Sequence, residues 1–366
     1  MYPCAFQAAN KTTGAASVHA QNANRTVSGG LIITHFKSPF TIGPSGSTLA
    51  PATTEGFILF GMHVSKLRQF LDLLSIWTTA LSSEMLTEPL LAVGGLGGSG
   101  TRVVGQILQE LGFYLGPELN PQLDNILFTL LFKRRDWFAS FPDDAEIERS
   151  IETFVATMHH GGETILARLS IAQRAHLFEQ TRGLGVNRKR FNQILSSAAP
   201  DLGRHSAIAW KEPNTHIFLP QLTRTLPNLK YMHVMRHGLD MALSGNRQQL
   251  INWGAQFDLG DAATDDSPNI QLEYWLKVNH RALDIGRVMG PDRFLLVNYD
   301  RLCRDFDTEV RHIEEFLGLS LTASGRAELS TGIHSTSAGR HLDVPADTFS
   351  PEERQAVAEL GFEVAS

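Results

Sequence analysis

The sequence predicts an α/β protein: a three-layer fold with a mostly parallel central sheet, flanked by helices and carrying a helical insertion. Two observations support this prediction. From Leu90 onward, short apolar runs alternate with segments of helical periodicity, as strands and helices do along a parallel sheet. The chain also has 366 residues, 42% of them hydrophobic, which is enough to bury both faces of such a sheet. We therefore expect one α/β domain over residues 86–366.

Four apolar runs predict strands, and each is followed by a turn. They are residues 90–95, 207–210, 230–236 and 294–299. The spacing of apolar positions predicts five helices, with Gly318 ending the last. They are residues 102–111, 216–226, 240–250, 274–288 and 308–317. Between the first two strands, the sequence predicts a mostly helical insertion over residues 118–205, placed over one end of the sheet.

The chain before residue 86 has a different character. Residues 1–55 are rich in Ala, Thr, Ser, Gly and Asn without periodicity, which predicts a disordered or loosely attached segment. Residues 56–85 predict an amphipathic helix that docks on the domain or pairs with a partner. Its apolar stripe consists of Leu67, Phe70, Leu71, Leu74 and Trp77. His63, Lys66, Arg68 and Asp72 lie within the same stretch and argue against a transmembrane segment.

Composition narrows the location and the partners. A net charge of −6 and a pI near 6.2 do not indicate a nucleic-acid partner, which usually requires a clustered cationic face. Two distant cysteines, Cys4 and Cys303, favour a reducing compartment, and no secretory signal pattern opens the sequence, so we expect a cytoplasmic protein. No metal site is predicted, because the adjacent His159 and His160 would diverge by about 100° on a helix.

The stretch LLAVGGLGGSGTRVV, residues 90–104, predicts an anion-binding loop. Its glycines let the backbone turn tightly after a strand, and Ser99 and Thr101 add hydroxyl groups at a helix N-terminus. The pattern of a nucleotide triphosphatase loop fits only as far as GLGGSG, because Thr101 stands where the lysine should be. A glycine-rich turn without a ligand is the alternative.

Two further cations follow predicted strands. Arg236 ends the third strand, and Ser244 lies eight residues later, which would place it about two turns into the next helix on the same side. A guanidinium and a hydroxyl that converge in this way suit a phosphate monoester. Lys211 follows the second strand, with Pro213 fixing the turn, and can reach the same edge of the sheet. The alternatives are an arginine that caps the sheet, a serine packed within the helix, and a solvated lysine.

Four segments together resemble the sulfotransferase family, enzymes that use 3′-phosphoadenosine 5′-phosphosulfate. They are GGSGTR, WKEP, LPNLKYMHVMRHGLDMALS and FLLVNYDRLCRDFDTEVRHIEEFLGL, in the family's order and spacing. The pattern is most similar to the tyrosylprotein and carbohydrate branches and to their bacterial relatives. The resemblance extends from Leu90 to the C-terminus and implies a P-loop-like fold.

The resemblance implies a role for each matching residue. The loop would hold the 5′-phosphosulfate, Arg236 and Ser244 the 3′-phosphate, and Lys211 the sulfuryl group. Glu118, nineteen residues after the loop serine, corresponds to the catalytic base, and Arg340 in the C-terminal loop HSTSAGRHL is a further phosphate contact. The loop residues are Gly97, Gly98, Ser99, Gly100, Thr101 and Arg102. In-line transfer to an acceptor hydroxyl follows, without a metal, and the acceptor would lie beside residues 118–205.

One position departs from the family pattern. The family commonly has lysine or arginine before the loop serine, and this sequence has Gly98, so Arg102 would supply the charge. The acceptor could be a carbohydrate, a peptide tyrosine or a small metabolite. A kinase-like phosphotransferase, a catalytically inactive nucleotide-binding relative, and a scaffold built around residues 57–81 remain alternatives. Asp124 has no assigned function, whereas Asp240 and Asp300 are interpreted as a helix N-terminal charge and a strand-end turn residue.

Overall fold

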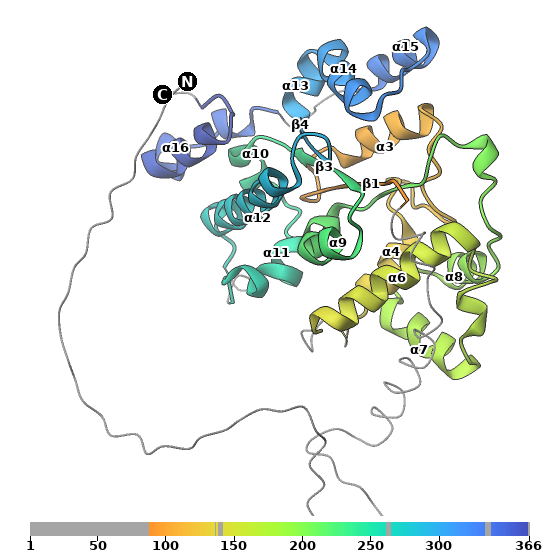
Figure 1. The fold of residues 1–366 in the computed structure, drawn as a ribbon. Coiled ribbons are helices and arrows are strands. Elements are labelled where there is room, and N and C mark those ends of the chain that lie inside the picture. The colour runs from red at the N-terminus through yellow and green to blue at the C-terminus, as the bar shows by residue number, and fades with distance from the viewer. Residues whose placement is uncertain (1–87, 136, 138–141, 261–264, 334–337, 365–366) are drawn as a thin grey trace, which may run out of the picture. The chain divides into compact units, whose positions relative to one another are not determined.

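The computed structural model describes residues 88–135, 137, 142–260, 265–333 and 338–364, and the predicted segments 1–55 and 56–85 lie outside them. At the centre is a parallel sheet with the strand order β2-β1-β3-β4 (Figure 1). The strands are β1 (Leu90–Gly95), β2 (Ala209–Lys211), β3 (Leu229–Met235) and β4 (Phe294–Asn298). Helices flank this sheet, so the predicted α/β fold class is confirmed.

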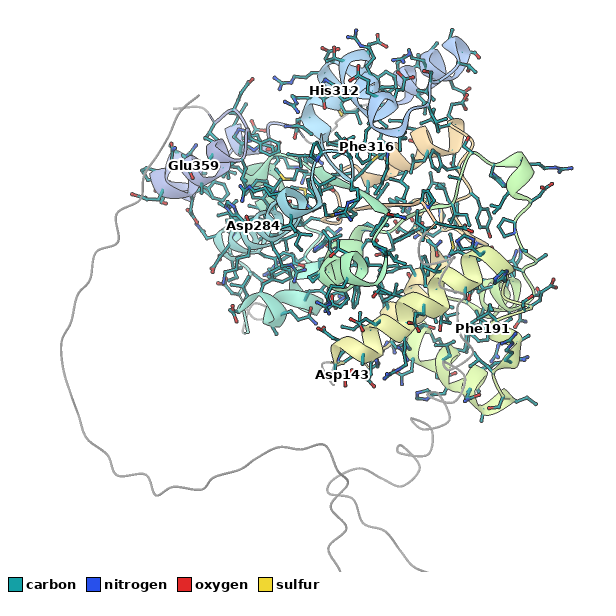
Figure 2. The ribbon with its side chains drawn as sticks, in the orientation of Figure 1. Asp143, Phe191, Asp284, His312, Phe316 and Glu359 are labelled. Atoms are coloured by element: carbon teal, nitrogen blue, oxygen red, sulfur yellow. The ribbon has the colours of Figure 1, made fainter. Side chains whose placement is uncertain are left out.

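Helices cover both faces of the sheet. Alternate strand residues point to opposite sides and pack against different helices. On one face, Leu91 and Val93 pack with apolar residues of α3 (Thr101–Glu110) and α14 (Phe306–Leu317). On the other face, Leu90 and Ala92 pack with those of α4 (Ile126–Phe132), α6 (Asp144–His160), α9 (Leu219–Thr225) and α12 (Pro268–Met289). Side chains fill the space between these layers (Figure 2).

The segment between α3 and β2 holds the helices expected of an insertion. Besides α4 and α6, these are α7 (Ile171–Thr181) and α8 (Arg188–Leu195). Polar side chains cap all four of these helices: Asn125, Asp143, Ser170 and Asn187 each accept a hydrogen bond from a backbone N–H in the first turn. These local caps favour helices in this segment.

Some predicted boundaries were wrong, for local reasons. The predicted helix 240–250 is divided into α10 (Gly238–Ala242) and α11 (Gln248–Trp253). Between them, Gly245 is a poor helix former, and the hydroxyl of Ser244 accepts a hydrogen bond from the N–H of Asn246, which competes with helical bonding. Likewise, α9 begins at Leu219 after a 3₁₀ helix at Pro213–Phe218, and Pro220 lies in its first turn, where its missing N–H leaves no helical hydrogen bond unmade.

The C-terminal part of the chain adds three helices that were not predicted. They are α13 (Tyr299–Arg304), α15 (Ala323–Gly332) and α16 (Pro351–Glu359). α13 begins directly at the end of β4, capped by Asn298, and so places Tyr299 at the carboxyl edge of the sheet. Within the described ranges, no helix is both long enough and apolar enough to cross a bilayer.

Candidate functional site

The glycine loop between β1 and α3 is built around two glycines with positive φ. Gly98 and Gly100 both have φ 96°, a conformation that favours glycine. At Gly100 a neighbour also excludes any side chain, because a Cβ would lie 2.0 Å from the ring of Tyr299. The loop therefore packs directly against the aromatic ring that follows β4.

This loop presents hydrogen-bond donors that have no partner. Ser99 is only 1% exposed, yet its hydroxyl has no hydrogen-bond partner. Among the described residues, no hydrogen bond is made by the backbone N–H groups at positions 98, 100, 101 and 102. Open amides at a helix N-terminus beside a buried hydroxyl suit an anion. Two loop amides are already occupied, since the N–H of Gly97 donates to Oε1 of Gln249 and that of Ser99 to the carbonyl of Leu96, each at 3.0 Å.

Arg236 follows β3 and meets this loop. Its Nη1 donates to the carbonyl of Gly98 at 3.4 Å, and its guanidinium carbon lies 5.7 Å from the centroid of the Tyr299 ring. Trp275 fixes the backbone there by donating to the Arg236 carbonyl at 3.1 Å. β1 and β3 are neighbours, and the helices that follow them cover opposite faces, so a crevice is expected beyond their carboxyl ends. The loop and Arg236 meet at this crevice.

Ser244 does not lie where the sequence suggested. It was expected about two turns into a helix, but it lies in the turn between α10 and α11, after α10 has ended at Ala242. Gln271 of α12 holds this turn by donating to the Ser244 carbonyl at 2.9 Å. Ser244 lies outside a helix because the predicted helix 240–250 is broken near Gly245.

Lys211, the last residue of β2, is not a solvated lysine. Only 2% of it is exposed, and its Nζ forms an ion pair with Asp124 and donates to the carbonyl of Gln122 at 2.9 Å. Its stem runs beside α3, where a Cβ on Gly105 would lie 3.6 Å from the Lys211 Cγ. Burial lowers the pKa of Lys211, and the adjacent Asp124 carboxylate opposes that shift.

Glu212, the next residue, projects to the opposite face and is fully buried. Its carboxylate forms an ion pair with Lys133 and accepts the Asn214 N–H at 2.7 Å. The side-chain oxygen of Asn214 in turn accepts from Gln249 at 3.0 Å and from Trp253 at 2.8 Å. Because Gln249 holds the Gly97 amide, a continuous chain of polar contacts links Lys133 in the insertion to the glycine loop.

Glu118 lies six residues before Asp124 in the chain and contacts the insertion. Its Oε1 is 3.2 Å from Nε of Arg190 on α8, and its side chain is 17% exposed. Its carbonyl accepts the N–H of Ile126, and the neighbouring Asn125 N–H donates to the Lys211 carbonyl at 2.8 Å. The residues proposed as base and as sulfuryl ligand are thus attached to one short stretch of chain.

The remaining predicted site residues are Arg102 and Arg340. Arg102 is exposed in the first turn of α3. Arg340 begins a short 3₁₀ helix, and its neighbours bind Asp240 of α10: Gly339 N donates at 2.7 Å, and His341 donates from its N–H at 3.0 Å. Burial alone would raise the pKa of Asp240, but hydrogen bonds from His341 and Gly339 outweigh it and lower that pKa.

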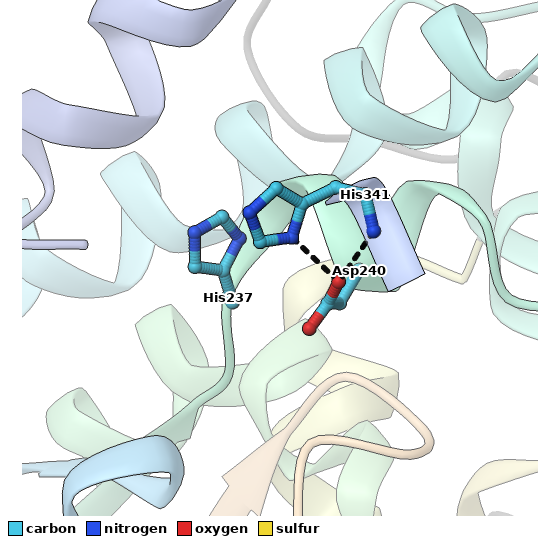
Figure 3. A group of neighbouring side chains, drawn as sticks. All are labelled: His237, Asp240 and His341. Atoms are coloured by element: carbon cyan, nitrogen blue, oxygen red, sulfur yellow. Dashed lines mark hydrogen bonds and ion pairs between the residues drawn. The ribbon is translucent and has the colours of Figure 1, made fainter. Parts of the chain in front are cut away.

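His237, Asp240 and His341 form a cluster that we call the clasp (Figure 3). His341 Nδ1 lies 2.7 Å from Asp240, and its ring stacks on that of His237 at 4.2 Å between centroids and 9° between planes. Imidazole lone pairs lie in the ring plane, so two nearly parallel rings cannot aim both at one ion in this arrangement. The clasp instead fastens the C-terminal loop to α10.

Several residues of the site were not found from the sequence. Tyr299 could have been noticed, because it ends the predicted strand 294–299 and so falls at the carboxyl edge of the sheet. Gln249 and Asn214 give no such signal, since they take part only through side-chain contacts between distant segments. Asp124 and Arg190 lie in the insertion, where local sequence indicates helices but not which side chains face the sheet.

A model of the protein family described as the sulfotransferase family matches residues 89–323 of the sequence. The chain belongs to this family. The match includes the glycine loop, Glu118, Lys211, Arg236 and Ser244 of this sulfotransferase, whereas the clasp residue His341 and the adjacent Arg340 lie beyond it. No curated protein matches the sequence at a significant level.

Solved sulfotransferase structures are similar to this sulfotransferase. The sulfotransferase domain from the Synechococcus PCC 7002 olefin synthase is 16% identical, with a TM-score of 0.42, over 76% of this chain and 96% of that one. The sulfotransferase domain from the curacin biosynthetic pathway is 14% identical, with a TM-score of 0.42, over 76% and 100%. A sulfotransferase from Alicyclobacillus acidocaldarius is 13% identical, with a TM-score of 0.35, over 75% and 91%. Similarities at this level add no detail to the family match.

Proposed function

We propose that this sulfotransferase transfers the sulfuryl group of 3′-phosphoadenosine 5′-phosphosulfate to an acceptor hydroxyl by in-line displacement. The observation that carries the proposal is the buried, unpartnered hydroxyl of Ser99 among open amides, beside the guanidinium of Arg236. Hydrogen-bond donors without partners in a crevice at the carboxyl edge of a parallel sheet suit a ligand with several anionic groups. No metal is required, since sulfuryl transfer needs alignment and charge stabilisation more than covalent help from the protein.

The residues divide into a donor side and an acceptor side. The loop from Gly97 to Arg102 would hold the 5′-phosphosulfate. The 3′-phosphate would contact Arg236, Ser244 and, from the C-terminal loop, Arg340. Lys211 and Arg102 would stabilise the sulfuryl oxygens and the charge that develops on the leaving phosphate, a contribution of about 2.7–4 kcal/mol per donor in comparable sites.

On the acceptor side, Glu118 would take the proton of the hydroxyl. In that role its carboxylate must exchange the contact with Arg190 for one with the acceptor. The acceptor, a carbohydrate, a peptide tyrosine or a small metabolite, would lie beside residues 118–205. We further propose a cytoplasmic location, from the two distant cysteines, and no nucleic-acid partner, from the net charge.

Isothermal titration with 3′-phosphoadenosine 5′-phosphate in EDTA tests the nucleotide site. We expect the wild type to bind and Arg236→Ala to bind roughly 10–100-fold more weakly, since charged hydrogen bonds are worth about 1.5–3 kcal/mol. Arg287→Ala, at a mostly exposed arginine of α12, should bind as the wild type does.

ATP with Mg²⁺ is the comparison ligand. Tight binding of ATP alone would favour the kinase-like alternative and contradict the proposal. Binding of the bisphosphate without sulfate transfer from the phosphosulfate to any acceptor in a panel would favour an inactive relative, in which Gly98 has removed the loop cation.

A further inference from the structure

Asp124 carries a mostly buried carboxylate to which the function proposed above assigns no role. It lies just before α4, and its Oδ1 pairs with the ammonium of Lys211. The side chain of Asp124 is 19% exposed, whereas that of Lys211 is 2% exposed. The carboxylate is therefore the partner that lies nearer to solvent. The ammonium has one further contact, the Gln122 carbonyl at 2.9 Å.

The carboxylate is fixed in place by its own turn. Asn120 Nδ2 donates to Asp124 Oδ2 at 2.8 Å, and Asn120 Oδ1 accepts the N–H of Asp124 at 2.8 Å and that of Gln122 at 2.9 Å. Leu123 has φ 63°, a strained conformation for a leucine. The turn is thus held by polar contacts that also aim Asp124 at Lys211.

Asp124 is the counter-charge of Lys211. Two other charged groups act on this lysine through space: Glu212, which follows β2, and Lys133, which follows α4. Those two residues pair with each other, so their charges largely cancel at Lys211. An ammonium that is desolvated without a counter-charge loses its proton readily. Charge on Lys211 therefore depends on Asp124.

Attachment of the turn to the sheet does not need this pair. The backbone N–H of Asn125 already donates to the Lys211 carbonyl at 2.8 Å, which ties the turn to the end of β2. A buried ion pair adds little stability over an apolar pair of similar size, because both ions must be desolvated. A purely structural role leaves the pair unexplained.

We propose that Asp124 is a positioning residue of the transfer site, whose carboxylate keeps the ammonium of Lys211 charged and fixed at the carboxyl end of β2. This inference rests on the proposed role of Lys211 toward the sulfuryl group. Lys211 is then already charged and in position when the donor binds, and Asp124 acts on the donor only through Lys211.

The test is the pH dependence of donor binding by the full chain. The probe is 3′-phosphoadenosine 5′-phosphosulfate without acceptor, titrated between about pH 6 and about pH 9.5 into the wild type and Asp124→Asn. Removing the carboxylate lowers the pKa of Lys211 further, so the variant loses the cation at a lower pH than the wild type does. We expect similar affinities near pH 6 and a variant about tenfold weaker at the alkaline end. Reporting the ratio of the two affinities cancels the titration of the ligand itself.

Lys211→Arg supplies the rescue. Arginine stays charged throughout this range, so Lys211→Arg and Asp124→Asn with Lys211→Arg should bind with a ratio that does not change with pH. Asp284→Asn, at a mostly exposed aspartate of α12, is the matched control and should follow the wild type.

Each result decides a different question. A ratio of wild type to Asp124→Asn that grows with pH, and is flat in the arginine background, supports the inference. A ratio that is constant with pH overturns it and leaves the proposed function intact, as does growth that persists in the arginine background. Failure of the wild type to bind the phosphosulfate at any pH overturns the proposed function and the inference with it.

Discussion

At the scale of single residues, Gly98 and Gly100 of the loop are required for different reasons, which the sequence cannot distinguish: backbone conformation and lack of space for a side chain. Both have φ 96°, but only Gly100 lies against another side chain, the ring of Tyr299. At Gly98, a Cβ would meet nothing closer than Cε of Met241 at 3.8 Å. Position 98 is therefore constrained by its backbone, and position 100 by its backbone and by its neighbour.

Gly98→Ala and Gly100→Ala form a matched pair of variants. Each pays about 1–2 kcal/mol for an alanine in the left-handed region, but only Gly100→Ala also displaces Tyr299. We expect Gly100→Ala to unfold at the lower temperature and to lose binding of 3′-phosphoadenosine 5′-phosphate, with the milder effect for Gly98→Ala. Thermal unfolding and calorimetry measure both. Equal effects would mean that the contact with Tyr299 does not set the loop.

At the scale of elements, both ends of α4 lie beside two consecutive residues at the end of β2, Lys211 and Glu212. Asp124 precedes α4 and pairs with Lys211, whereas Lys133 follows α4 and pairs with Glu212. Lys211 and Glu212 point to opposite faces of the sheet, so the two ion pairs lie on two sides of it. This arrangement orients the first helix of the insertion relative to the glycine loop.

Lys133→Met tests the second of these pairs. It leaves the carboxylate of Glu212, which is fully buried, without its cation, and we expect a loss of about 3 kcal/mol in the free energy of unfolding. Glu212→Gln combined with Lys133→Met should recover part of that loss, because no charge is then left buried. Urea unfolding of the single and double variants measures the coupling. A single variant as stable as the wild type would show that solvent or another group replaces Lys133.

The elements themselves were largely predictable, and their long-range contacts were not. β1 was predicted at its observed bounds, because an apolar run followed by glycines is a strong local signal. The helix 240–250 was wrong, because one serine hydroxyl bonded to a nearby backbone N–H breaks the helix there. At the site, Arg236 and the loop meet, as expected of residues that follow parallel strands, but the pairing of Asp124 with Lys211 depends on how the insertion folds back.

At the scale of the whole sheet, one buried histidine links stability to pH. His233 of β3 has no exposed surface, and its ring bonds to Asn279 of α12 at 2.8 Å and to the Tyr231 hydroxyl at 3.1 Å. Burial lowers the pKa of His233 to about 4. The unfolded chain therefore binds a proton near its ordinary pKa of about 6.5, whereas the folded chain does not until about pH 4.

Stability is therefore expected to fall as the pH decreases through this window. The contribution of His233 is fully present above about pH 6.5, and roughly 3 kcal/mol is lost by about pH 4. Chemical unfolding at several pH values should give a shallower loss for His233→Gln than for the wild type. Parallel curves for the two proteins would assign the acid sensitivity to other groups.

The parallel sheet also sets the order in which the protein assembles. β1 pairs with no strand that is close in sequence: its register joins Leu91 to Ala209 on one side and Leu90 to Leu229 on the other. Such pairs must close the whole insertion before any ladder bond forms, whereas the capped helices of the insertion need only local contacts. During synthesis on a ribosome, β1 emerges before the other three strands, and both its edges stay unpaired until β2 and β3 have been made. A chain that stops early therefore exposes an apolar strand that is prone to aggregation, and the crevice where the glycine loop meets Arg236 is completed late in folding.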